Sequence, residues 1–255
     1  MAWWSKSDGR GSASVRESLR PLVALHTAAA AHLSADHTDA AVELFEVVLA
    51  GCQTQLGRTD PDTLTVAGNL GVALVAAGRW RDGIDRLVDN LVDRERALGE
   101  DDPRTLAACD ALATAYRLAG HLDDAAELAA RVTSERRRTL GPAHPDTLTS
   151  RMGMALTRAA TGDVGSAATL LQAALNDAEQ AHGPLHLHTI ALRSNVAACH
   201  AVLGNARQAT AVFERAGADS AALLGRDHPD TMAIYEDLAD VNNPERLGIL
   251  AGVPA

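Results

Sequence analysis

A nine-residue segment recurs five times in this chain at a constant spacing of 42 residues. The copies read LGRTDPDTL from Leu56, LGEDDPRTL from Leu98, LGPAHPDTL from Leu140, HGPLHLHTI from His182 and LGRDHPDTM from Leu224. A second glycine keeps the same period, at Gly78, Gly120, Gly162 and Gly204. Because no insertion interrupts the spacing, the pattern predicts repeated supersecondary units that stack on one another.

Each unit carries the signals of two helices. In the second unit, Asp60 suits a helix N-cap and Pro61 suits the first helical position. Apolar residues then recur at spacings of three and four as far as Gly78, a residue type that commonly ends helices. A second amphipathic stretch runs from about residue 80 to residue 97. The unit is therefore predicted to be an antiparallel helical hairpin with about 17 residues per helix.

One hairpin cannot bury its apolar stripe alone, but stacked neighbours can. Hydrophobic residues make up 47% of the chain and aromatic residues only 3%, so alanine and leucine must supply most of the packing. The predicted fold class is all-α, an α-solenoid of about five tandem hairpins with a C-terminal capping helix. The predicted boundaries are a disordered segment 1–16, an array 17–241 with units of about 17–55, 60–97, 102–139, 144–181 and 186–223 and a cap helix 229–241, and a short tail 242–255.

Further residues keep the same phase in several units. Asn69-Leu70-Gly71 and Asn195-Val196-Ala197 occupy equivalent positions, and Gly204 is followed by Ala209 and Phe213. With the His-Pro-Asp-Thr starts, these residues resemble the long-helix tetratricopeptide repeats of the kinesin-light-chain type, which are common in bacterial multi-repeat proteins. The resemblance covers about Ser18 to Val241. It departs from the pattern at Leu187, which stands where proline is expected.

The resemblance implies that the first helix of each hairpin lines a concave face on which partners bind. Most residues that the register places there are small or apolar, which favours an apolar peptide or helix as the ligand. The predicted groove residues are Asn69, Val72, Val75, Asp110, Thr114, Arg117, Met152, Leu156, Asn195, Ala198 and Val202. For the two asparagines, two interpretations stay open. Their amides could bind the main chain of a peptide, or they could bond within the scaffold.

Three histidines cluster at the boundary that lacks the proline, at His182, His186 and His188. Zinc needs convergent imidazoles and usually a fourth ligand, and the neighbouring sequence offers no cysteine or aspartate for that role. A degenerate repeat boundary explains these residues more simply, and we expect no cofactor. His144 and His228 stand at predicted helix starts, where the repeat itself accounts for them.

Charge and cysteine usage narrow the function classes. The net charge of −10 and the scarcity of aromatic residues disfavour a nucleic-acid surface. Three separated cysteines form no CxxC motif, so a reducing cytoplasmic environment is expected. We identify no signal peptide and no apolar run long enough to span a membrane. The exposed ends of the array offer surfaces through which a homo-oligomer could form.

The sequence therefore favours a protein–protein or peptide interaction module that acts as an adaptor or regulatory scaffold. A first alternative is a ligand- or peptide-sensing regulatory protein that acts in trans. A second is an enzyme on a helical-repeat scaffold, although no nucleophile elbow or phosphate-binding loop is present. Fold alone does not choose among them, since function depends on the residues of a site.

Overall fold

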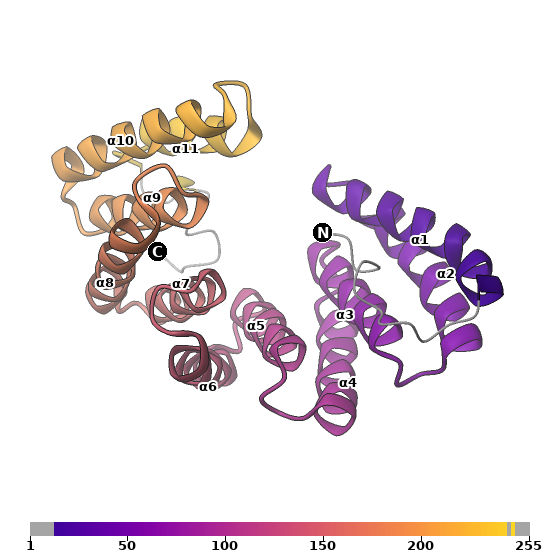
Figure 1. Ribbon diagram of the computed structural model, residues 1–255. Coiled ribbons are helices and arrows are strands. Elements are labelled where there is room, and N and C mark those ends of the chain that lie inside the picture. The colour runs from indigo at the N-terminus through magenta and orange to yellow at the C-terminus, as the bar shows by residue number, and fades with distance from the viewer. Residues whose placement is uncertain (1–12, 244–245, 248–255) are drawn as a thin grey trace. The chain divides into compact units, whose positions relative to one another are not determined.

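The computed structural model describes residues 13–243 and 246–247, and for residues 13–18 it describes only the backbone. Eleven helices occupy this part of the chain, and it contains no strand (Figure 1). Their bounds are α1 Ala13–Ser34, α2 Thr38–Leu56, α3 Pro61–Ala76, α4 Trp80–Leu98, α5 Pro103–Leu118, α6 Leu122–Leu140, α7 Pro145–Ala160, α8 Val164–His182, α9 Leu187–Val202, α10 Ala206–Leu224 and α11 Pro229–Ala239.

The all-α solenoid predicted from the sequence is confirmed, and consecutive helices pair as hairpins. From the second hairpin to the fifth, each first helix has 16 residues and each second helix has 19. The helix α1 begins at Ala13, which corrects the expectation that residues 13–16 lack structure. The rest of the N-terminal prediction, and most of the predicted tail 242–255, fall outside the described residues.

The glycines of both series stand at the ends of helices, where the backbone adopts a positive φ. Gly78 has a φ of 74° and Gly57 a φ of 94°, and an added Cβ at either position would meet no atom within 4 Å. Glycine is therefore required by the backbone angle and not by space. After α3, the Arg79 N–H donates to the Leu74 carbonyl over 2.9 Å, the six-residue closure of a Schellman motif.

The first helices begin with side-chain caps. The Asp62 N–H donates to Asp60 Oδ1 over 2.9 Å, and Pro61 follows the cap. In later hairpins a histidine takes the place of this aspartate, as the Asp146 N–H donates to His144 Nδ1 over 3.2 Å. The caps satisfy N–H groups that have no partner inside the helix, which fixes where each first helix starts.

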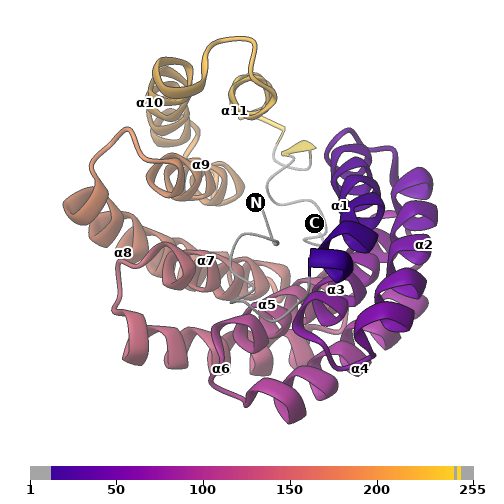
Figure 2. The same cartoon turned by 45° about the vertical axis from the view of Figure 1, so that its right-hand side comes forward.

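The chain divides into two compact units, unit 1 up to Ala115 and unit 2 from Tyr116. In unit 1, α1 and α2 pack beside α3 (Figure 1). The core of this unit includes Phe45, with 1% of its surface exposed. In unit 2, the helices α7 to α11 follow one another in a stack (Figure 2). Their shared core includes Phe213, which is fully buried. Phe45 and Phe213 occupy the same repeat phase, so one packing arrangement serves both units.

Candidate functional site

A cavity of about 250 Å³ lies within unit 1, among α3, α4 and α5. Asn69 and Val72, two of the predicted groove residues, line it together, and Val72 is 38% exposed. Most other lining residues are small or apolar. The complete lining is Thr65, Gly68, Asn69, Val72, Leu87, Asn90, Arg94, Arg104, Ala107, Ala108 and Ala111.

Gly68 contributes to this cavity by lacking a side chain. A Cβ added at Gly68 would lie 3.1 Å from Asn90 Oδ1. The Asn90 amide, which donates over 2.7 Å to the Leu64 carbonyl, therefore approaches the backbone of α3 closely. Because Asn90 is buried, this contact connects the two helices of the hairpin beneath the cavity.

Arg94 reaches the cavity from α4, the second helix of its hairpin. Only 6% of its surface is exposed, and its guanidinium donates to Asn90 Oδ1 over 3.0 Å and to Thr65 Oγ1 over 3.3 Å. Burial, and secondly the charge of Arg104, lower the pKa of Arg94 from its ordinary value. Arg94 is not among the predicted groove residues, because all of those lie on first helices and Arg94 lies on a second helix.

The two asparagines in equivalent positions both contact the preceding repeat. Asn69 Nδ2 lies 2.9 Å from Nε2 of His26, which is buried in α1 and whose pKa burial lowers. Asn195 Nδ2 lies 3.4 Å from Met152 Sδ and donates to the Ala191 carbonyl over 2.8 Å. Both amide groups thus make contacts inside the scaffold, although Asn195 Oδ1 is buried without a hydrogen-bond partner.

The remaining predicted groove residues fall into two groups. Val75 and Ala198 lie in the core, where 7% and 0% of their surfaces are exposed. Val75 packs against Gly83 of α4, since a Cβ added there would come within 2.6 Å of Val75 Cγ2. The other positions are partly or fully accessible in their own units. They are Asp110 and Thr114 in unit 1, and Arg117, Met152, Leu156 and Val202 in unit 2.

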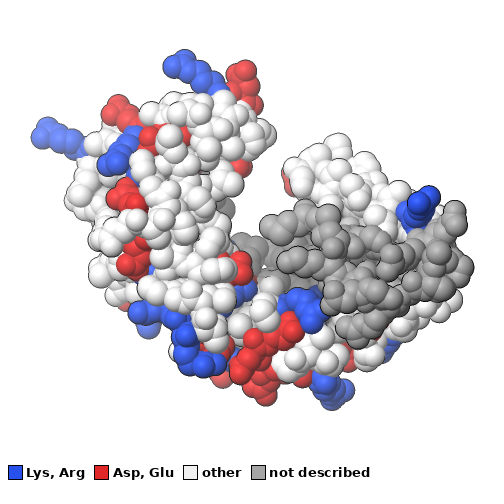
Figure 3. Space-filling model, viewed as in Figure 1, with Lys and Arg blue, Asp and Glu red and all other residues white. Residues whose placement is uncertain are grey.

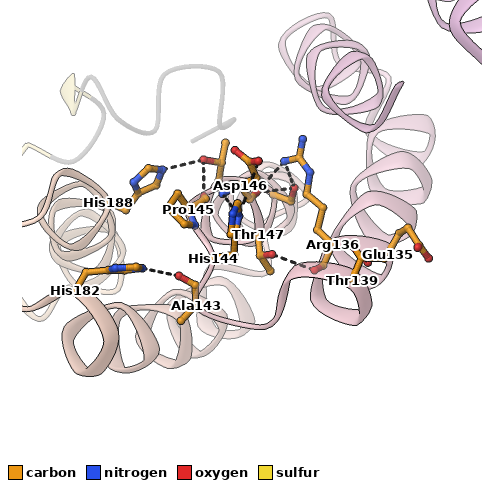
Figure 4. Close-up of polar contacts among 12 residues, drawn as sticks. Glu135, Arg136, Thr139, Ala143, His144, Pro145, Asp146, Thr147, His182 and His188 are labelled. Carbon is orange, nitrogen blue, oxygen red and sulfur yellow. Dashed lines mark hydrogen bonds and ion pairs between the residues drawn. The ribbon is translucent and has the colours of Figure 1, made fainter. Parts of the chain in front are cut away.

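The histidines at the α8–α9 boundary stack on one another. The rings of His182 and His186 lie 4.5 Å apart between centroids, and those of His186 and His188 lie 5.4 Å apart. His182 Nε2 contacts the Ala143 carbonyl at 2.6 Å and His188 Nε2 contacts Thr149 Oγ1 at 3.2 Å, as Figure 4 shows. These contacts attach the boundary to the preceding hairpin.

The geometry of these histidines differs from that of a metal centre. Zinc ligands direct ring nitrogens at one point, whereas neighbouring rings here lie nearly parallel, with 22° between planes. In the described part of the chain, no group of three His, Cys, Asp or Glu side chains is arranged to hold a metal ion. The boundary acts as a contact between repeats.

The surface carries both signs of charge. On the face that Figure 3 displays, acidic and basic side chains are interspersed over the described residues of both units. No helix among the described residues is both long enough and apolar enough to cross a membrane. The displayed face therefore carries opposite charges close to one another.

Family comparisons agree with the repeat geometry. Two models described as tetratricopeptide repeat match residues 62–134 and residues 189–230. The chain contains tetratricopeptide repeats. Such a scaffold is a protein–protein interaction adaptor, and its partners are proteins. No curated protein matches the chain.

Solved structures support the kinesin-light-chain type of tetratricopeptide repeat that the sequence resembled. The nearly identical repeats of a putative kinesin light chain from Podosopora anserina match at 25% identity and a TM-score of 0.64, covering 80% of this chain and 97% of that one. A variant of the same repeats with one substitution matches at 26% identity and a TM-score of 0.65, covering 79% of this chain and 95% of that one. BtubC (BKLC) from P. vanneervenii shares the fold, at 18% identity, a TM-score of 0.63, and coverage of 85% and 92%.

Proposed function

We propose that this tetratricopeptide-repeat protein is an adaptor that binds an apolar peptide or helix of a partner protein on its first helices. The observation that carries the proposal is the cavity of unit 1, where the exposed Val72 adjoins small residues of α3 and α5. Small side chains let a ligand approach the helices closely, and an exposed valine offers apolar surface for it to cover.

The proposed binding surface in unit 1 consists of Asn69, Val72, Asp110 and Thr114. In unit 2 the corresponding surface consists of Arg117, Met152, Leu156 and Val202. Val75, Ala198 and Asn195 do not belong to it, because all three are buried. Asn69 supports the surface by its contact with His26, so we expect it to hold the shape of the site as well as to meet the ligand.

A pair of valines in one hairpin tests the proposal. Val72 on α3 and Val92 on α4 are 38% and 36% exposed, so replacing either by glutamine changes polarity at equal exposure. Peptides would be selected from a random phage library on the purified protein, and their dissociation constants measured by calorimetry. We expect Val72→Gln to weaken binding about tenfold, because a polar group would face an apolar ligand. Val92→Gln should leave affinity unchanged.

Two outcomes contradict the proposal. Equal loss of affinity in both variants would show that the ligand does not depend on the face of the first helices. Failure to select any specific peptide would favour the other functions, in which the protein senses a small ligand or catalyses a reaction. Thermal melting of each variant beforehand ensures that only folded protein is compared.

A further inference from the structure

Arg94 is a deeply buried cation that makes no hydrogen bond or ion pair with a carboxylate, although the charge of Asp102 acts on it from a greater distance. In unit 2, the buried Arg151 pairs with Asp177 over 2.7 Å, and the buried Arg193 pairs with Glu179 over 2.6 Å and with Asp219. Arg94 is buried to the same degree, yet both of its hydrogen bonds go to the neutral side chains of Asn90 and Thr65. Removing a charge from water without an opposite charge is costly, so this site favours an anion.

The neighbouring Asp102 offsets the charge of Arg94 only through space, because its carboxylate forms its hydrogen bonds with Arg104. Arg104 also lines the cavity, but its guanidinium already forms an ion pair with Asp102 through two hydrogen bonds of 3.0 Å. Asp102 in turn accepts the Arg104 N–H over 2.8 Å as the cap of α5. The Arg104–Asp102 pair is thus complete, and the excess positive charge at the cavity belongs to Arg94.

Arg94 also has donor capacity to spare. Its Nε and Nη2 atoms make the two hydrogen bonds to Asn90 and Thr65, and Nη1 makes none within the described residues. A guanidinium has five N–H groups in a planar fork that matches a carboxylate. A carboxylate at Nη1 would therefore add charge-assisted hydrogen bonds without displacing those already present.

The walls of the cavity match the hydrocarbon part of an acidic side chain. Val72 and Leu87 are apolar, and Gly68 with the three alanines of α5 leaves the space open. A glutamate or aspartate that enters this space places its methylene groups against apolar atoms and its carboxylate near Arg94. The Asn69 side chain is a further polar group that lines the same space.

We propose that this cavity binds the side-chain carboxylate of a glutamate or aspartate from a partner peptide, with Arg94 as its counter-ion. This inference rests on the proposed function, which it deepens by naming one feature of the ligand: an acidic residue within an otherwise apolar segment. The net charge of −10 opposes an acidic ligand at long range, so the attraction is confined to this cavity.

The test uses small probes whose binding does not depend on a selected peptide. The purified protein, labelled with ¹⁵N, is titrated with N-acetyl-glutamate N-methylamide and with the isosteric glutamine compound. The side-chain amide resonances of Asn69 and Asn90 report on the cavity. We expect saturable shifts with the glutamate compound and binding about tenfold weaker with the glutamine compound, because a charge-assisted bond exceeds a neutral one. N-acetyl-glycine, whose carboxylate is terminal, should also bind more weakly.

Two variants test separately the charge of Arg94 and the open space of the cavity. Arg94→Met keeps the length of the side chain and removes the charge, and an apolar replacement of a buried charge commonly preserves the fold. It should abolish the preference for glutamate over glutamine. Ala107→Leu fills the cavity from an exposed position without touching Arg94, and it should weaken the glutamate compound severalfold.

Several results would overturn the inference. These are no response to the glutamate compound, an equal response to glutamate and glutamine, a preference retained in Arg94→Met, or stronger binding of N-acetyl-glycine. Its failure is distinguishable from failure of the proposed function. If peptides bind through Val72 but the glutamate compound does not bind, only the proposed carboxylate site is wrong. If the glutamate compound binds but no peptide is selected, only the adaptor proposal is wrong.

Discussion

Units 1 and 2 begin their first helices with the same geometry but with different chemistry. In unit 1, the carboxylates of Asp60 and Asp102 accept backbone N–H groups over 2.9 and 2.8 Å. In unit 2, the imidazoles of His144, His186 and His228 accept them over 3.2, 3.3 and 3.2 Å. An ionised carboxylate accepts a hydrogen bond, whereas Nδ1 of a histidine accepts only while the ring is unprotonated, so acid removes a histidine cap before a carboxylate cap.

The three histidine caps are not equivalent. His144 lies 3.8 Å from an oxygen of Asp146, and His228 lies 3.7 Å from one of Asp230, so an ion pair offsets the lost cap after protonation. At the corresponding place after His186 stands His188, which provides no negative charge. The start of α9 is therefore the cap with the least protection against acid.

Other titrating groups sharpen the difference between the units. In unit 1, burial and then the neighbouring Asp60 raise the pKa of Asp62 to about 6, so the folded unit binds a proton more readily than the unfolded chain. Acidification from pH 7 to 5 thereby favours the folded state at Asp62, and the lowered pKa of His26 acts in the opposite direction. In unit 2, burial lowers the pKa of His186, His188 and His200, so all three disfavour folding as pH falls below 6.5.

The largest expected effect comes from the two equivalent phenylalanines. Phe45→Ala and Phe213→Ala should each cost about 3–5 kcal/mol of unfolding free energy, because each removes a buried ring. Hydrogen exchange should show lost protection mainly in the unit that carries the substitution, since repeats couple chiefly to neighbours. If Phe45→Ala unprotected α9 and α10 as strongly as α1 and α2, the two units would not be energetically separate.

The second prediction concerns acid. On lowering the pH from 7.5 to 5.5, amides in the first turn of α9 should lose protection by roughly 1 kcal/mol, the usual worth of a cap. The first turn of α3, capped by Asp60, should change less. Hydrogen exchange corrected for the intrinsic pH dependence measures both segments in one sample. A uniform change across α3 and α9 would show that the caps do not govern the response.

Exchanging the caps gives a smaller, more specific effect. His186→Asp should restore an acceptor at pH 5.5 and stabilise the protein there by up to about 1 kcal/mol, with little effect at pH 7.5. Asp60→His is the reciprocal variant and should make α3 sensitive to acid. Urea unfolding at the two pH values measures both variants. Identical pH dependence in wild type and His186→Asp would contradict this account.

The smallest effect involves the threonines that follow the caps. Thr147 Oγ1 donates to the Arg136 carbonyl over 3.2 Å, whereas Thr189 Oγ1 is buried without a partner. Thr147→Val should cost about 1 kcal/mol, and Thr189→Val should be neutral or stabilise by a few tenths, because no hydrogen bond is lost. Thermal unfolding of the two variants is the measurement. A larger loss from Thr189→Val would indicate an acceptor for that hydroxyl.

The fold was predictable because its signals are local. Glycines that require positive φ and caps such as Asp60 mark helix ends within a few residues, and the 42-residue period repeats these signals. The candidate site was less predictable because it depends on contacts between helices. The repeat register predicts Val75 in the groove, but its side chain packs on Gly83 of α4. The direction in which a residue points around the helix axis decides whether it faces the groove or the second helix.

Arg94 also shows that contacts between helices are hard to predict from the sequence, here for a residue that was not expected at the site. Its repeat equivalent Arg136 donates to Ser150 over 2.8 Å, but the residue in the phase of Ser150 next to Arg94 is Ala108. Aligning the repeats reveals this missing acceptor. Only the three-dimensional arrangement shows that Arg94 then turns to Thr65 and Asn90 and faces a cavity.

The pairing of each helix with its neighbours along the chain also bears on how the protein is made. Contacts join α1 to α2, α2 to α3 and α3 to α4 in unit 1. In unit 2 they join each helix from α6 to α11 to the next one, and α7 also contacts α9. Such short sequence separations lower the entropy cost of closing loops and favour rapid folding. During synthesis, unit 1 can complete its core before unit 2 leaves the ribosome. Little apolar surface of unit 1 then stays exposed while the rest of the chain is made.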